Sequence, residues 1–430
     1  MKKDIKFKIN MELWQKAKEK LKKDFPSIFA EHCMDTDCTL VLLMLLLISE
    51  EKIYPDTVFL HTDLGSNPEH SKHCKTIEVH NALKDKLSQI YKNSNPSQLL
   101  ELAILSYLEM NLDNYMSRIY PLYTIIGYKN TDMQQATATA IKNMNLHTEQ
   151  MTFVDACCAT GSLFFGTYNH PWKKVILNDL NPLRTNFLNV LLKKPLELIK
   201  GILSIDFSFI NTPDTMNPQR RIYKEATETY RDNRRNYHKV DCNVEIAVYT
   251  FILQCIDKKF IEQSDKIFRR LGGFLPAHAK LVTCNATITQ EDCLSYLENE
   301  ENKLVLLDVP YIGSEKECGI KDYDYNSFHH KVSAKLEKAK YPFIYYCRSS
   351  APKSDKRYNT IQAHEIIKKK LGLFFFNKGY HFEQVQLEQD TELMISNQHY
   401  SPDRQIQWTP ETTDLLFPKA EVSPVTVTNE

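Results

Sequence analysis

The first part of the chain shows a helical period of apolar positions, followed by apolar and polar runs of different lengths. Trp14, Ala17 and Leu21 recur at helical spacing among lysines, which predicts an amphipathic helix. The elements that the pattern predicts here are a helix at 11–30, an apolar helix at 39–48, a strand at 55–61 and a polar, helix-forming run at 70–115. We therefore expect an N-terminal α/β accessory domain at 1–115.

Farther along, strand-like and helical stretches alternate. The expected elements are a strand-like start at 120, an alanine- and threonine-rich helix after it, strand–loop–helix at 151–166, a strand at 173–179, a helix at 183–194, a strand at 304–308, a helix at 328–340, a strand at 342–347, a helix at 361–371 and two strands within 380–397. Alternation of this length predicts a parallel, doubly wound sheet. This second α/β domain would cover 116–205 and 276–405.

Residues 206–275 interrupt this rhythm and predict an insertion, with a helix at 244–260. Between 220 and 239 seven basic side chains outnumber three acidic ones and alternate with tyrosines, a mixture that suits phosphate and base contacts, although a solvated loop would also explain it. These candidate DNA-binding residues are Arg220, Arg221, Lys224, Arg231, Arg234, Arg235 and Lys239. From 406 to 430 the composition predicts a flexible tail.

Composition narrows the class of protein. The 430 residues carry no formal net charge, so any affinity for nucleic acid must come from a local patch. None of the 11 cysteines forms a CxxC pair, which favours reduced thiols in a cytoplasmic protein and predicts no metal site. The start lacks a secretory segment, and the longest apolar run, Leu40–Ile48, is too short to cross a bilayer, so we expect no membrane association.

Candidate chemistry lies where the predicted strands end. Asp155 ends a strand and opens the small-residue loop DACCATGS, in which Gly161 precedes a helix. Asp179 ends the next strand, where a carboxylate suits ribose hydroxyls, although a helix N-cap before Pro182 is the alternative. The loop matches neither GxGxxG nor a P-loop. A nucleoside cofactor that lacks phosphate, such as S-adenosylmethionine, is therefore favoured.

The stretch LVLLDVPYIGS (304–314) has an apolar strand that stops at a carboxylate. Asp308 and the carbonyl of Val309 could accept the two N–H groups of an exocyclic amine on a nucleobase. Pro310 would stiffen the turn, and Tyr311 would stack on an extruded base, a contact worth about 1–3 kcal/mol. The alternative is a loop whose sequence arose by chance.

An ordered set of motifs carries a family resemblance. IGYKN (126–130), DACCATGS (155–162), NDLN (178–181), ITQEDCLSYL (288–297), DVPY (308–311) and ELMISN (392–397) resemble the Dam-like DNA adenine N6-methyltransferases. The resemblance implies a Rossmann-like class I methyltransferase fold, S-adenosylmethionine as methyl donor, double-stranded DNA as substrate and 206–275 as target-recognition region. By position, it implies a catalytic loop of Asp308, Val309, Pro310 and Tyr311, and cofactor contacts from Gly127, Lys129, Asp155, Cys157, Ala159, Gly161, Asp179 and Asp292.

The chain departs from the family pattern at three positions. The family usually has proline at 309, an aromatic residue at 157 and glycine at 159, where this chain has Val309, Cys157 and Ala159. Val309 keeps the carbonyl acceptor, whereas the methyl of Ala159 would weaken cofactor binding. A capping or surface role is the alternative for Asp292, and a surface role for Lys129. Alternative functions are cytosine N4 methylation and a catalytically impaired DNA-binding or decoy protein.

The N-terminal domain has a fainter resemblance to the PAPS-reductase-like nucleotide-binding family. The family loop SGGKDS corresponds here to CMDTDC (33–38), which lacks both glycines and the lysine. A backbone cradle for phosphate needs those residues, so we expect no pyrophosphatase activity. The domain would instead be structural or bind a protein partner. The host could be a bacterium or a phage.

Overall fold

The computed structural model describes residues 5–24, 74–79, 103–105, 107–108, 131–167, 170–203, 242–255, 270–271, 273–298, 300–311, 325–348, 375, 380–386 and 391–398. Several predicted segments lie outside these residues, namely the helix at 39–48, the strand at 55–61, the loop at 33–38, the strand-like start at 120, the helix at 361–371 and the tail at 406–430. The chain packs as two units. One comprises Met1–Tyr128 and Asn181–Thr283, and the other Lys129–Leu180 and Cys284–Glu430.

The N-terminal segment begins with strand β1 (Ile5–Asn10) and helix α1 (Met11–Asp24). The Asn10 side chain caps the helix, because its Oδ1 accepts the backbone N–H groups of Glu12 and Leu13 at 2.9 and 3.2 Å. Along α1, the buried side chains are the three that recur at helical spacing, Trp14, Ala17 and Leu21. The helix predicted from 11 onward is confirmed through Asp24.

Strand β2 (Cys74–Val79) pairs antiparallel with β1, from Ile5 opposite Val79 to Asn10 opposite Cys74. The prediction of a helix-forming run at 70–115 was wrong at these six residues. A partner strand outweighs weak helical propensity, since each strand supplies the hydrogen bonds that the other needs. The alternation of apolar and basic residues in IKFKI (5–9) favours a strand and was the sequence signal for this pairing.

The rest of the first unit contains four described helices, namely α10 (Pro182–Lys193), α11 (Pro195–Leu203), α13 (Val244–Cys255) and α15 (Phe274–Thr283). Their core includes Phe187, Phe251 and Phe274, whose ring centroids are 5.3–6.4 Å apart. Asn186 exchanges two hydrogen bonds with the backbone of Asn243, at 2.7 and 2.9 Å. The predicted helices at 183–194 and 244–260 are confirmed where the structure describes them.

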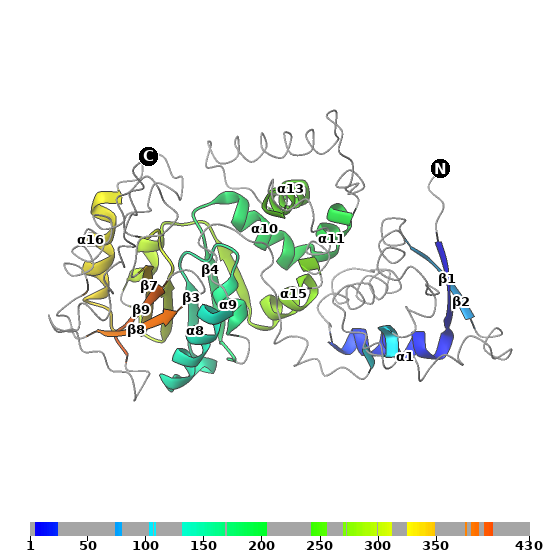
Figure 1. Cartoon of the computed structure of the whole chain (residues 1–430), viewed down its shortest axis with the longest axis horizontal. Coiled ribbons are helices and arrows are strands. Elements are labelled where there is room, and N and C mark those ends of the chain that lie inside the picture. The colour runs from blue at the N-terminus through cyan, green and yellow to red at the C-terminus, as the bar shows by residue number, and fades with distance from the viewer. Residues whose placement is uncertain are drawn as a thin grey trace, which may run out of the picture. The chain divides into compact units, whose positions relative to one another are not determined.

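The second unit is built on a seven-stranded sheet (Figure 1). Its strands are β3 (Thr152–Asp155), β4 (Lys174–Asn178), β5 (Ala286–Thr289), β6 (Lys303–Leu307), β7 (Phe343–Arg348), β8 (His381–Gln386) and β9 (Thr391–Ser396). The order is β5-β4-β3-β6-β7-β9-β8, and the first five are parallel. β9 runs antiparallel to both of its neighbours. The predicted α/β class with a mostly parallel sheet is confirmed, and the sheet is compatible with a Rossmann-like fold.

One face of the sheet is covered by α8 (Thr131–Asn143) and the short α9 (Ser162–Gly166) (Figure 1). Phe153 of β3 contacts Phe164 of α9, with ring centroids 5.7 Å apart. The hydroxyls of Thr137 on α8 and Tyr346 on β7 are 2.9 Å apart in a buried hydrogen bond. Side chains of β3 and β7 therefore anchor these two helices.

The opposite face packs against α16 (Tyr325–Leu336). Phe328, Val332 and Leu336 of this helix share a core cluster with Val154 and Tyr345 from the sheet. The helix was predicted at 328–340, and the observed helix begins three residues before and ends four residues before those bounds. Its end is a turn in which Lys338 donates to the carbonyl of Lys335 at 3.1 Å, shortly before Pro342 leads into β7.

Candidate active site

Three acidic residues lie at the carboxyl ends of three neighbouring strands. Asp155 is the last residue of β3, and Asp179 and Asp308 directly follow β4 and β6. β3 lies between β4 and β6, and Asp155 is in register with Leu177 and Leu306. Because these strands are parallel, all three acidic residues belong to one edge of the sheet. Asp155 and Asp179 are 0% and 6% exposed, whereas Asp308 is partly exposed.

This edge is also where the chain reverses its direction across the sheet. Successive strands β3, β4 and β5 follow one another to one side, and β6 then returns to the other side of β3. In open α/β sheets, ligands bind outside the carboxyl ends of the strands at such a switch point. The three acidic residues therefore occupy the position that this topology assigns to a ligand.

The loop after β3 is held by its backbone. The N–H of Cys158 donates to the carbonyl of Asn178 at 2.7 Å, and the N–H of Gly161 donates to the carbonyl of Cys158 at 2.6 Å. Gly161 has φ 73°, and a Cβ there would come within 2.9 Å of the Phe165 ring, so the loop requires glycine. Ala159 also has a positive φ, 51°, which destabilises a non-glycine residue by about 1–2 kcal/mol.

Asp179 faces this loop. Its Oδ2 accepts the backbone N–H of Ala159 at 3.0 Å, so the carboxylate joins the ends of β3 and β4. The alternative role of Asp179 as N-cap of the following helix is wrong. Asn181 is the N-cap of α10, since its Oδ1 accepts the N–H of Leu183 at 2.9 Å.

Asn178, at the end of β4, holds the segments that follow β3 and β5, a positioning role that the sequence did not predict. Its Nδ2 donates to the carbonyls of Ala156 and Glu291 at 2.9 and 3.0 Å. Its Oδ1 accepts the N–H of Glu291 at 2.9 Å and the hydroxyl of Thr289 at 3.1 Å. The buried amide thus uses two donors and two acceptor positions, and it fixes the segments after β3 and β5 to the end of β4. A polar residue at the end of an apolar strand was the available signal.

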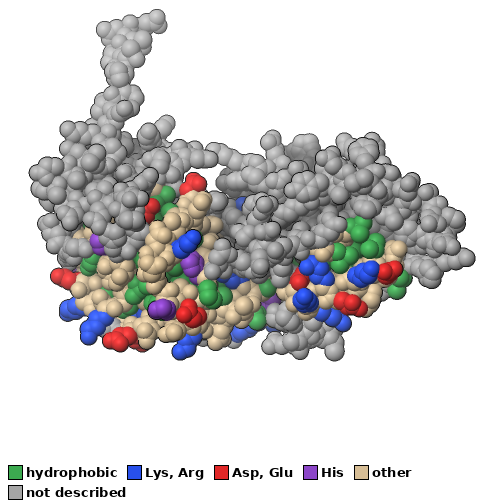
Figure 2. All heavy atoms as spheres, turned by 90° about the horizontal axis from the view of Figure 1, so that it is seen from below, with side chains coloured by type: hydrophobic (Ala, Val, Ile, Leu, Met, Phe, Trp, Pro, Cys, Tyr) green, Lys and Arg blue, Asp and Glu red, His purple; other side chains and the backbone are tan. Residues whose placement is uncertain are grey.

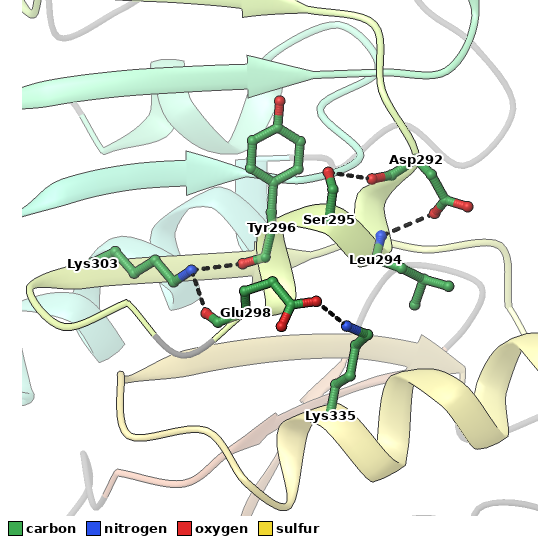
Figure 3. A network of polar contacts seen from close by, with 7 residues as sticks. All are labelled: Asp292, Leu294, Ser295, Tyr296, Glu298, Lys303 and Lys335. Carbon is green, nitrogen blue, oxygen red and sulfur yellow. Dashed lines mark hydrogen bonds and ion pairs between the residues drawn. The ribbon is translucent and has the colours of Figure 1, made fainter.

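Asp292 follows β5 and begins the short helix η5 (Cys293–Leu297). Its Oδ1 accepts the N–H of Leu294 at 2.9 Å, and its carbonyl accepts the hydroxyl of Ser295 at 2.7 Å (Figure 3). The capping role that sequence offered as the alternative is therefore present. Because β5 neighbours β4, the structure also brings Asp292 to the edge that carries Asp179.

The far end of η5 is held by a buried lysine. Nζ of Lys303 donates to the carbonyls of Tyr296 and Glu298 at 2.8 and 2.7 Å, and burial lowers the pKa of this amine (Figure 3). Glu298 in turn pairs with Lys335 of α16. The two ends of η5 are thus fixed by different groups, Asp292 at its start and Lys303 at its end.

Cys157 connects the loop after β3 to η5. A hydrogen bond with the thiol of Cys293, together with burial, raises the pKa of Cys157 well above its ordinary value. The nearby charges of Asp179 and Asp155 act in the same direction. Cys157 is therefore a neutral, half-buried thiol at physiological pH, and it lies where the resemblance implies an aromatic residue.

The segment after β6 combines core packing with polar contacts. Val309 is 2% exposed and belongs to the core cluster, so a branched side chain occupies the core where the resemblance implies proline. Tyr311 is 8% exposed, and its hydroxyl donates to Oε1 of Glu392 at 2.7 Å. Burial, Asp308 and Glu392 together raise the pKa of Tyr311 well above its ordinary value. Pro310, half-buried, lies between these two anchored side chains.

The other predicted site residues lie outside the described part of the chain. They are the cofactor candidates Gly127 and Lys129, and the DNA-binding candidates Arg220, Arg221, Lys224, Arg231, Arg234, Arg235 and Lys239. On the face shown in Figure 2, the described acidic and basic side chains are interspersed. The basic surface expected at residues 220–239 lies outside the described residues.

No protein-family model matches the chain, and the search of curated proteins found no match. Within the described residues, no three histidine, cysteine or acidic side chains gather as metal ligands. Among the described helices, none is long and apolar enough to span a membrane.

Proposed function

We propose that the chain is an S-adenosylmethionine-dependent DNA methyltransferase that modifies the N6 amino group of an extruded adenine. One observation carries this proposal. Asp155, Asp179 and Asp308 lie at the carboxyl ends of the neighbouring strands β3, β4 and β6, where the strand order reverses. The order β5-β4-β3-β6-β7 with reversed β9 also supports the class I methyltransferase fold that the resemblance implies.

The residues on the β3–β4 side suit the proposed cofactor. The loop is built from small residues and lacks the glycine pattern that cradles phosphates, which favours a nucleoside without phosphate. The hydroxyl of Thr160 is buried and has no hydrogen-bond partner among the described residues, so it could serve a ligand. Asp155, Gly161 and Asp179 would hold the cofactor, with Asp292 at its adenine end. When bound, the cofactor would supply an activated methyl group.

The residues on the β6 side suit the amine. An exocyclic amino group is a poor nucleophile because its lone pair is delocalised into the base. Asp308 is partly exposed at this edge, and its carboxylate would accept one N–H while the carbonyl of Val309 accepts the other. These two acceptors would favour the tetrahedral nitrogen that can attack a methyl group, and Tyr311 would hold the base by stacking.

The test is to incubate the protein with labelled methyl donor and mixed DNA, digest the DNA and identify the modified nucleoside by mass spectrometry. We expect N6-methyladenine from the wild type and none from Asp308→Ala. The matched control is Glu301→Ala, which removes an exposed carboxylate just before the opposite end of the same strand. N4-methylcytosine would instead establish the chemical alternative. Undiminished transfer by Asp308→Ala would remove Asp308 from the catalytic role.

A second candidate function is a catalytically impaired DNA-binding or decoy protein. The strained Ala159 favours it, because this residue occupies the loop position at which the family has glycine and its N–H already engages Asp179. Calorimetric titration with S-adenosylmethionine separates the two candidates. Binding supports the methyltransferase, and no detectable heat for a folded protein supports the decoy.

A further inference from the structure

Glu392 reaches the candidate active site only because β9 runs antiparallel. In a sheet whose other strands all end at this edge, a reversed strand begins there instead. The register pairs Glu392, near the start of β9, with Arg348 at the end of β7. The topology therefore delivers the first residues of the late motif ELMISN to the edge that carries Asp308.

Glu392 and Tyr311 form a buried pair across 81 positions of sequence. The two residues are each 8% exposed, and the phenol donates to Oε1 of Glu392 at 2.7 Å. A buried carboxylate needs such partners, and a hydrogen bond to an ionised acceptor is stronger than one between neutral groups. The hydroxyl end of the tyrosine is thereby fixed.

One face of the same ring is occupied as well. The guanidinium carbon of Arg348 lies 5.4 Å from the centroid of the Tyr311 ring, within the range of a cation–π contact. The hydroxyl held by Glu392 and the face covered by Arg348 together restrain the orientation of the ring.

We propose that Glu392 is a positioning residue that sets the plane of Tyr311 for stacking on an extruded nucleobase. This inference rests on the proposed function and adds to it a role for the reversed strand. Glu392 acts through Tyr311 and touches neither cofactor nor amine. Its effect should therefore depend on the tyrosine hydroxyl, which a purely structural role for Glu392 would not require.

The first test is a double-mutant cycle on methyl transfer. Glu392→Ala and Tyr311→Phe should each lower kcat about tenfold, and the double variant should lose about the same tenfold, because the two side chains act as one unit. The KM for S-adenosylmethionine should not change. Glu392→Gln retains an oxygen acceptor and should fall between the wild type and Glu392→Ala. Losses that multiply in the double variant would overturn the proposal.

The second test does not depend on methyl transfer. DNA in which some adenines are replaced by 8-azidoadenine is irradiated with the protein, and the cross-linked peptide is identified by mass spectrometry. We expect a cross-link at Tyr311 in the wild type and at least a fivefold lower yield in Glu392→Ala, at equal DNA binding and with melting temperatures recorded. An equal yield, or no cross-link in the folded wild type, overturns the positioning role. A cross-link without methyl transfer overturns the proposed function alone.

Discussion

The loop after β3 and the segment after β6 begin at neighbouring strands and are held in different ways. The β3 loop is fixed by backbone hydrogen bonds and by the amide of Asn178. The β6 segment is fixed by side chains, with Val309 in the core and Tyr311 bonded to Glu392. Substitutions in the first region should therefore act through backbone conformation, and those in the second through packing and orientation.

The same difference applies to two positions at which the resemblance implies other residues. Val309, where the resemblance implies proline, packs its branched side chain in the hydrophobic core. Ala159, where the resemblance implies glycine, has a positive φ that is strained for alanine. The side chain of Val309 thus contributes to packing, whereas the backbone of Ala159 is strained.

Replacing Asn178 should have the largest effect on stability. Replacing it with alanine removes four hydrogen bonds and leaves the buried carbonyl of Ala156 and the partly buried backbone groups of Glu291 with fewer partners. We expect Asn178→Ala to lower the free energy of unfolding by about 3 kcal/mol, measured by urea denaturation. Thr287→Ala, at an exposed position of β5, is the control and should change it by less than about 0.5 kcal/mol. Equal effects of the two substitutions would show that Asn178 does not hold the loops.

A smaller effect of opposite sign is expected at Ala159. Glycine relieves the left-handed strain but adds freedom to the unfolded chain, so Ala159→Gly should raise the free energy of unfolding by about 0.5–1 kcal/mol. Ala156→Gly, in the same loop but without a positive φ, should lower it by about 1 kcal/mol. If Ala159→Gly were instead destabilised, the positive φ of Ala159 would not be a source of strain.

The smallest effect concerns the reactivity of Cys157. The hydrogen bond to Cys293 and burial raise the pKa of the Cys157 thiol, so the reactive thiolate is scarce at neutral pH and increases only as pH rises toward the elevated pKa. Alkylation of Cys157 by iodoacetamide at pH 7.5, followed by peptide mass spectrometry, should be slower than alkylation of glutathione. Denaturation should remove the difference. If Cys157 reacted faster than glutathione, its pKa would be lowered, and the loop would have a conformation other than the one described.

Much of the second unit could be predicted from sequence, because its strands are short apolar runs between polar turns. The strands ending near Asp155 and Asp179 and the strand before Asp308 are all confirmed. The direction of β9 could not be predicted, since a period of two is the same in both directions. β2 was mistaken for helix because its pairing with β1 is not local.

The contacts that organise the candidate site were harder to predict than the acidic residues themselves. Asn178 and Glu291 are 113 positions apart, and Tyr311 and Glu392 are 81 apart, so no local pattern links them. The sequence indicated which strand ends carry polar groups. Only the sheet order showed that those ends are neighbours and that a reversed strand contributes to the same edge.

The central claim is that one edge carries a cofactor side at β3 and β4 and a catalytic side at β6. The most direct test measures, on the same preparations, the calorimetric Kd for S-adenosylmethionine and the rate of methyl transfer to DNA. We expect Asp308→Ala to abolish transfer with Kd changed less than about threefold, and Asp179→Ala to weaken binding by tenfold or more, about 1.4 kcal/mol. Unchanged binding by Asp179→Ala together with undiminished transfer by Asp308→Ala would contradict the claim.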